Sequence, residues 1–110
     1  MKLALPVSNN LVSEHFGHCE KFYFAEVVDG KVKSAQTVTP PPHEPGVIPK
    51  WLSENDVSVV ITGGMGPRAI QLLESFGIKV IIGVKSDKPE NILQKFLDGN
   101  LESGENVCDH

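Results

Sequence analysis

The hydrophobic positions of the chain fall into short runs that predict five strands, at residues 2–7, 21–28, 31–38, 57–62 and 78–82. The second run alternates around Phe22 and Phe24, and Asp29-Gly30 connects it to the third run. An Asp-Gly pair between alternating segments is a strong signal for an antiparallel hairpin. Residues 2–7 have the pattern of a short buried strand, residues 57–62 are rich in β-branched residues and end before Gly63-Gly64, and residues 78–82 form a further strand.

Three further segments have the spacing of amphipathic helices, at residues 48–55, 67–76 and 89–97. Pro67 suits the first position of the middle helix, and Gly77 suits its end. Residues 39–46 contain four of the eight prolines and therefore lack the amide donors of a helix or a central strand. We expect this segment to be an extended connection that presents His43 to a ligand or partner. The alternative is that His43 is a solvated loop residue.

The order of these elements predicts an α/β fold with a mixed five-stranded sheet. Alternating helices and strands in the second half favour parallel strands with right-handed crossovers, and the hairpin adds an antiparallel edge. Numbered along the chain, the strands are expected in the order 3-2-1-4-5, with helices covering the sheet. The loops at residues 8–20, 63–67 and 83–88 follow the parallel strands, so they should meet at one edge, where such sheets bind ligands.

Composition narrows the class of protein. The chain has 110 residues, 40% hydrophobic and 22% charged, which is typical of one soluble domain. We assign this domain to residues 1–99 and a tail to residues 100–110. The net charge is −4 and the basic residues are scattered, which argues against nucleic acid as a partner. Apolar runs are too short for a signal peptide or a membrane span, so we expect a cytoplasmic protein.

Potential metal ligands occur near both ends of the chain. His15, His18 and Cys19 lie within five residues, and Cys108 and His110 lie at the C-terminus. Imidazole and thiolate suit zinc, copper, iron and iron-sulfur centres. The alternative is that these are surface histidines and a small buried thiol. The two cysteines are expected to be free thiols or ligands, with a disulfide between them as the other possibility.

A glycine-rich turn precedes the second predicted helix. Gly63, Gly64, Met65 and Gly66 lie directly before Pro67, so the amides of the helix start and the charge of Arg68 favour an anion there. The turn also satisfies a Gly-x-Gly-x-x-Ala pattern, although the following strand ends without the acid that would hold a ribose. The alternative is a tight turn whose glycines serve packing alone. Met65 would either contact a soft metal or fill a gap.

Taken together, several segments resemble one known family over essentially the whole chain. They are residues 13–19 before the Phe-rich hairpin, His43 before residues 49–52, residues 63–66, and residues 108–110. This set resembles the dinitrogenase iron-molybdenum cofactor biosynthesis family, which includes NifX-like proteins and the C-terminal domain of NifB. The resemblance implies a three-layer ribonuclease H-like fold without nuclease activity.

The resemblance also implies a function. Proteins of this type bind or carry an iron-molybdenum cofactor, its iron-sulfur precursor or a related metal-sulfur cluster, and a cluster scaffold or acceptor protein is the implied partner. His15, His18 and Cys19 are the implied cluster contacts, and the glycine turn would hold the anionic face of the cluster. We therefore expect a non-catalytic carrier. The second hypothesis is a regulatory module that binds a nucleotide or small anion at residues 64–69.

Overall fold

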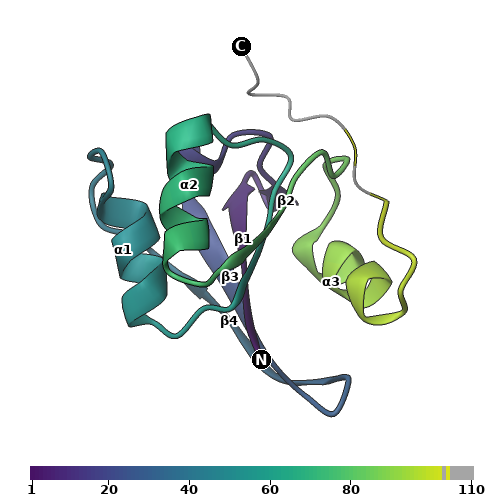
Figure 1. Ribbon diagram of the computed structural model, residues 1–110. Coiled ribbons are helices and arrows are strands. Elements are labelled where there is room, and N and C mark those ends of the chain that lie inside the picture. Colours follow the sequence, from purple (N-terminus) through teal and green to yellow (C-terminus); the bar gives the residue numbers. More distant parts are fainter. Residues whose placement is uncertain (103, 105–110) are drawn as a thin grey trace.

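The computed structural model describes residues 1–102 and residue 104 as a mixed sheet with helices on both faces (Figure 1). The strands are β1 (Lys2–Ser8), β2 (Leu11–Val12), β3 (Lys21–Val28), β4 (Lys31–Val38), β5 (Val59–Ile61) and β6 (Lys79–Ile81). The helices are α1 (Val47–Glu54), α2 (Pro67–Ser75) and α3 (Pro89–Leu97), and a 3-10 turn covers Phe16–His18. Among these helices, none has both the length and the hydrophobicity needed to cross a bilayer.

The order of the strands confirms the prediction. The main path of the sheet is β4-β3-β1-β5-β6, with β5 parallel to both β1 and β6. The prediction of five strands was wrong in one respect, because the short strand β2 pairs antiparallel with β1. Asn9 and Asn10 allow this pairing, since both adopt the left-handed conformation, with φ of 54° and 66°, and reverse the chain.

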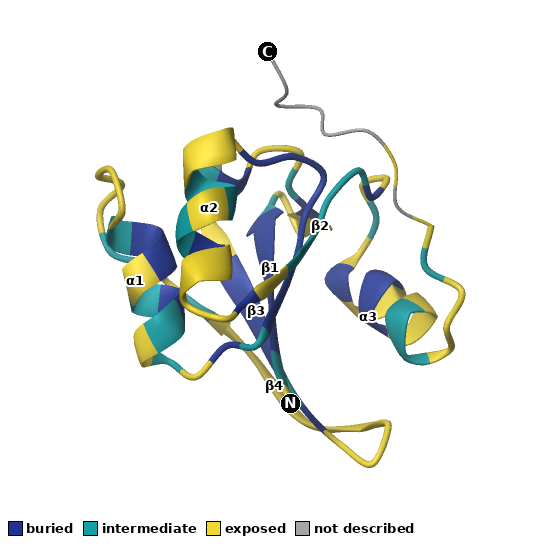
Figure 2. Cartoon of the chain, viewed as in Figure 1, coloured by how far each residue is buried: buried dark blue, intermediate teal, exposed yellow. Residues whose placement is uncertain are grey.

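The hairpin of β3 and β4 is confirmed as well. Asp29 and Gly30 both have positive φ, 53° and 75°, as a two-residue hairpin turn requires. The pairing begins with Val28 opposite Lys31 and runs to Phe22 opposite Val38. Figure 2 shows β4 and the hairpin tip exposed, whereas β1 and β3 are buried over most of their length.

Two hydrophobic clusters lie on opposite faces of the sheet, which explains the continuous apolar runs. On one face, Leu3 and Leu5 of β1 pack with Ile92 and Leu93 of α3. On the other face, buried residues of the strands pack with buried residues of α1 and α2. The strands contribute Ala4, Phe22, Phe24 and Val60, and the helices contribute Ile48, Leu52 and Leu73. Successive side chains of a strand point to opposite faces, so β1 contributes to both clusters.

Candidate functional site

Backbone hydrogen bonds join the three loops that were expected to meet at one edge of the sheet. The amide of Gly63 donates to the carbonyl of Ser13 (3.2 Å), and the amide of Phe16 donates to the carbonyl of Gly64 (3.0 Å). The amide of Gly83 donates to the carbonyl of Gly63 (2.9 Å). The first loop and the third loop therefore both bond to the glycine turn, as the order of the strands predicted.

Gly63 lies at the point of closest approach between these loops. A Cβ atom at this position would lie 2.9 Å from the Cα of Glu14 and 3.4 Å from the carbonyl oxygens of Ser13 and Val84. The neighbouring Thr62 is fully buried, and its hydroxyl donates to the carbonyls of Ser13 (3.2 Å) and Gly64 (3.3 Å). The packing interpretation of the glycines thus applies to Gly63.

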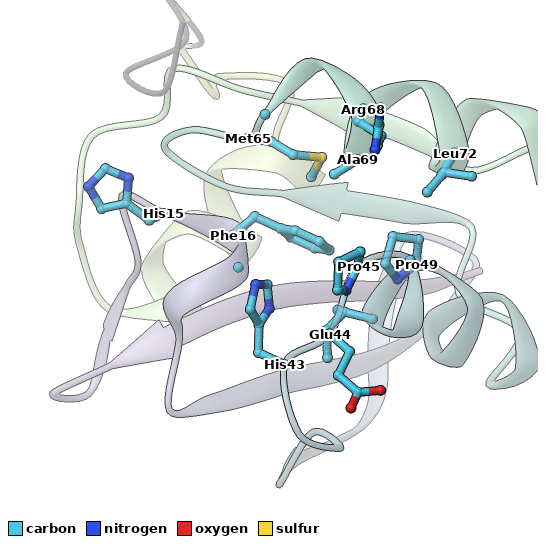
Figure 3. Close-up of a pocket in the computed structure, with 14 residues that line it drawn as sticks. His15, Phe16, His43, Glu44, Pro45, Pro49, Met65, Arg68, Ala69 and Leu72 are labelled. Atoms are coloured by element: carbon cyan, nitrogen blue, oxygen red, sulfur yellow. The ribbon is translucent and has the colours of Figure 1, made fainter. Parts of the chain in front are cut away.

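A cavity of about 490 Å³ lies beside this junction (Figure 3). Residues 15–17 of the first loop form one part of its wall, and residues 43–46 with Ile48 and Pro49 form another. Met65, Gly66 and the first turns of α2 complete it. Five of the residues predicted for the site therefore line the cavity, and they are His15, His43, Met65, Gly66 and Arg68.

The starts of two helices make this cavity suited to an anion. Gly46 precedes α1 and Gly66 precedes α2, both glycines line the cavity, and neither helix has an acidic residue in its first turn. The amides at a helix start have no acceptor within the helix and carry a partial positive charge. Arg68 adds a full charge, and Figure 3 shows the carboxylate of Glu44 directed away from Met65 and Arg68. Anionic ligands are therefore favoured.

Two imidazoles reach the cavity wall from separate segments. His15 precedes the 3-10 turn, and His43 comes from the proline-rich connection between β4 and α1. In Figure 3 they lie on different sides of Phe16. Both histidines are exposed. Both imidazoles therefore line the same cavity as Met65, which is almost fully buried.

Other predicted site residues lie elsewhere. Cys19 does not line the cavity; it is half-buried and packs against the hydrophobic cluster beneath α1 and α2. Gly63 and Gly64 are buried and do not line the cavity. The side chain of His18, and Cys108 and His110 entirely, fall outside the described residues. Within the described part of the chain, no group of three or more His, Cys, Asp or Glu residues is arranged to hold a metal ion.

Apolar lining residues were missed by the sequence analysis. Phe16 is 4% exposed and packs edge-to-face on Phe22, with ring centroids 5.7 Å apart. The sequence did contain a signal for Phe16, which lies between His15 and Gly17 in a predicted loop. A large apolar side chain in a loop is expected to pack against other apolar residues. Pro45, Pro49 and Leu72 also line the cavity, and their sequence context gave no such signal.

We expect Cys19 to react slowly with alkylating reagents. Burial raises the pKa of its thiol to about 11, although backbone hydrogen bonds at Cys19 and Val7 lower it. At about pH 8 the thiolate fraction, and with it the rate with iodoacetamide, should be at least about tenfold below that of a free peptide thiol. Peptide-level mass spectrometry measures this rate. If the alkylation rate of Cys19 reaches its plateau below about pH 9, the thiol does not have the raised pKa that burial predicts.

Comparisons with known proteins bear on the family and on the fold. The family model described as "Dinitrogenase iron-molybdenum cofactor" matches residues 1–99. The uncharacterized protein MJ0580 of Methanocaldococcus jannaschii is 34% identical over 110 residues, which cover 96% of this chain and 92% of that protein. The crystal structure of PH0822 has a TM-score of 0.88 and 31% identity, over 94% of each chain.

A further solved structure is that of the apo form of the orange protein from Desulfovibrio gigas. It has a TM-score of 0.76 and 25% identity, over 96% of this chain and 93% of that one. Because the family model covers nearly all of the chain and a relative of similar length exceeds 30% identity, the chain belongs to the dinitrogenase iron-molybdenum cofactor family.

Proposed function

We propose that this protein binds and carries a preassembled, anionic metal-sulfur cluster, either the iron-molybdenum cofactor or a related iron-sulfur precursor. Membership of the family supports a role in the binding or biosynthesis of a metallocluster. The observation that carries the proposal is the cavity in which two imidazoles, a thioether and the starts of two helices come together. We also propose that the sheet and its helices form a three-layer ribonuclease H-like fold. In this proposal the protein is a non-catalytic carrier.

The size and charge of the cavity fit such a cargo. Its volume of about 490 Å³ falls within the range usual for ligand pockets. Metal-sulfur clusters carry negative charge, which the amides at the starts of α1 and α2 and the guanidinium of Arg68 would stabilise. His15 and His43 would bind metal atoms of the cluster, and Met65 would offer a soft sulfur contact.

The donor set also argues that the cluster arrives already assembled. Proteins that build iron-sulfur clusters in place hold the iron with cysteine thiolates. The described residues that line this cavity include no cysteine, and Cys19 packs away from it with a raised pKa. A cargo held here would therefore be a cluster assembled elsewhere, which a scaffold protein would supply or an acceptor protein would receive.

Anoxic reconstitution tests this function. Clusters are first formed without oxygen from ferrous iron, sulfide and molybdate, and the protein is then incubated with these preformed clusters, desalted, and analysed for metal content and visible absorption. We expect retained metal and a coloured protein, and a chain that keeps neither iron nor molybdenum would overturn the proposal. Adenine nucleotides serve as the comparison ligand: if they raise the melting temperature while metals and sulfide do not, residues 64–69 form a nucleotide site instead.

Reversing the charge of Arg68 is expected to weaken cluster retention. Arg68→Glu places a carboxylate at the start of α2, where an anionic cargo would lie, and we expect about tenfold weaker binding that varies strongly with salt. The control is Lys33→Glu on the exposed strand β4, which changes the net charge equally but lies outside the cavity wall. Metal content after dialysis at several salt concentrations measures the difference, and equal losses in both variants would contradict a local effect.

A further inference from the structure

His43 reaches the cavity from a segment without regular secondary structure, and its ring lies against Gly17. A Cβ atom at position 17 would lie 2.9 Å from Cε1 of His43 and 3.6 Å from each of the two ring nitrogens. The first of these distances is shorter than the contacts that real side chains make, so the imidazole occupies the space that a side chain of residue 17 would need. This contact joins the proline-rich segment to the turn that follows His15.

The backbone of Gly17 does not itself require glycine. The glycines with positive φ are Gly30, Gly46, Gly77, Gly83 and Gly99, and Gly17 is not one of them. An alanine could therefore adopt the same backbone conformation, within the 3-10 turn Phe16–His18, without strain. What an alanine would disturb is the ring of His43. An alanine at position 17 would therefore displace the ring of His43 and leave the backbone in place.

We propose that Gly17 is a positioning residue for cargo binding, because it seats the His43 imidazole beside the turn that carries His15. The proposal rests on the proposed function, since it assigns the seated ring to cluster binding. Pro42 and Pro45 flank the dipeptide of His43 and Glu44 and restrict its backbone. With the backbone restricted and the ring held against Gly17, one imidazole is fixed at the cavity wall before any cargo arrives.

The seating itself is tested on the protein without cargo. We expect an NMR nuclear Overhauser contact between the Hε1 proton of His43 and the Hα protons of Gly17. In Gly17→Ala the ring signals of His43 should shift, whereas Gly66→Ala should leave them unchanged, because no described atom lies within 4 Å of a Cβ atom at position 66. Unchanged ring signals in Gly17→Ala would overturn the proposal, whatever the protein binds.

The role in binding is tested by a double-mutant cycle on protein loaded with the same preformed clusters. The concentration of chelator that removes half of the visible absorption measures retention. We expect Gly17→Ala to weaken retention about tenfold, as for loss of a residue that orients a metal ligand. In the His43→Ala background the same change should have no further effect. An equal loss in both backgrounds would overturn the assignment, whereas failure of the wild-type protein to retain metal would count against the proposed function alone.

Discussion

Replacing Gly63 with valine is expected to lower the free energy of unfolding by about 3 kcal/mol or more, at the upper end of the costs of overpacking. The new Cβ atom would meet the Cα of Glu14 at 2.9 Å and the carbonyl oxygens of Ser13 and Val84 at 3.4 Å. All three are backbone atoms, so no side chain can rotate to relieve the overlap, and the loops must separate. Such a loss is a large share of the roughly 5–15 kcal/mol that stabilises a domain.

The same substitution three residues later is the matched control. Gly66 has a φ of −64°, and no described atom lies within 4 Å of a Cβ atom there. Gly66→Val should therefore cost less than about 1 kcal/mol, chiefly through the poorer helix start. Urea unfolding followed by circular dichroism measures both variants. Equal midpoints for the two would show that the junction at Gly63 yields more easily than its geometry indicates.

The fold was largely predictable because local signals and topology agree. The Asp29-Gly30 turn fixed the hairpin, and Pro67 and Gly77 bracketed a helix that the structure places at Pro67–Ser75. The short strand β2 was missed because two residues are too few to show a period. It depends instead on the reversal at Asn9 and Asn10, which pairs Val7 with Val12.

The candidate site was only partly predictable, for a physical reason. Glycine turns and helix starts are local features, so Gly66 and Arg68 were found at the cavity. Whether Cys19 faces a cavity or the core depends on contacts with residues distant in the sequence, and its nearness to His15 along the chain was misleading. The contact of His43 with Gly17 joins segments 26 positions apart, which no local pattern reports.

Removing both imidazoles at the cavity wall is expected to have the largest effect on function. His15→Ala and His43→Ala should each weaken cluster retention about tenfold, and the double variant by about 100-fold or more, because two ligands on one cargo reinforce each other. Both side chains are exposed, so stability should change by less than about 0.5 kcal/mol in each single variant. Metal content and visible absorption after anoxic reconstitution measure the loss, and urea unfolding checks the stability.

Cys19→Ser is the variant that distinguishes this arrangement from a thiolate-bound cluster. The thiol packs against the core, and burial raises its pKa to about 11, so its replacement should leave the retained metal at the wild-type amount. A thiolate ligand would behave in the opposite way, because its loss would remove a strong bond to the metal. Retention that falls in Cys19→Ser and survives in the double histidine variant would place the cargo against the thiol and outside the cavity.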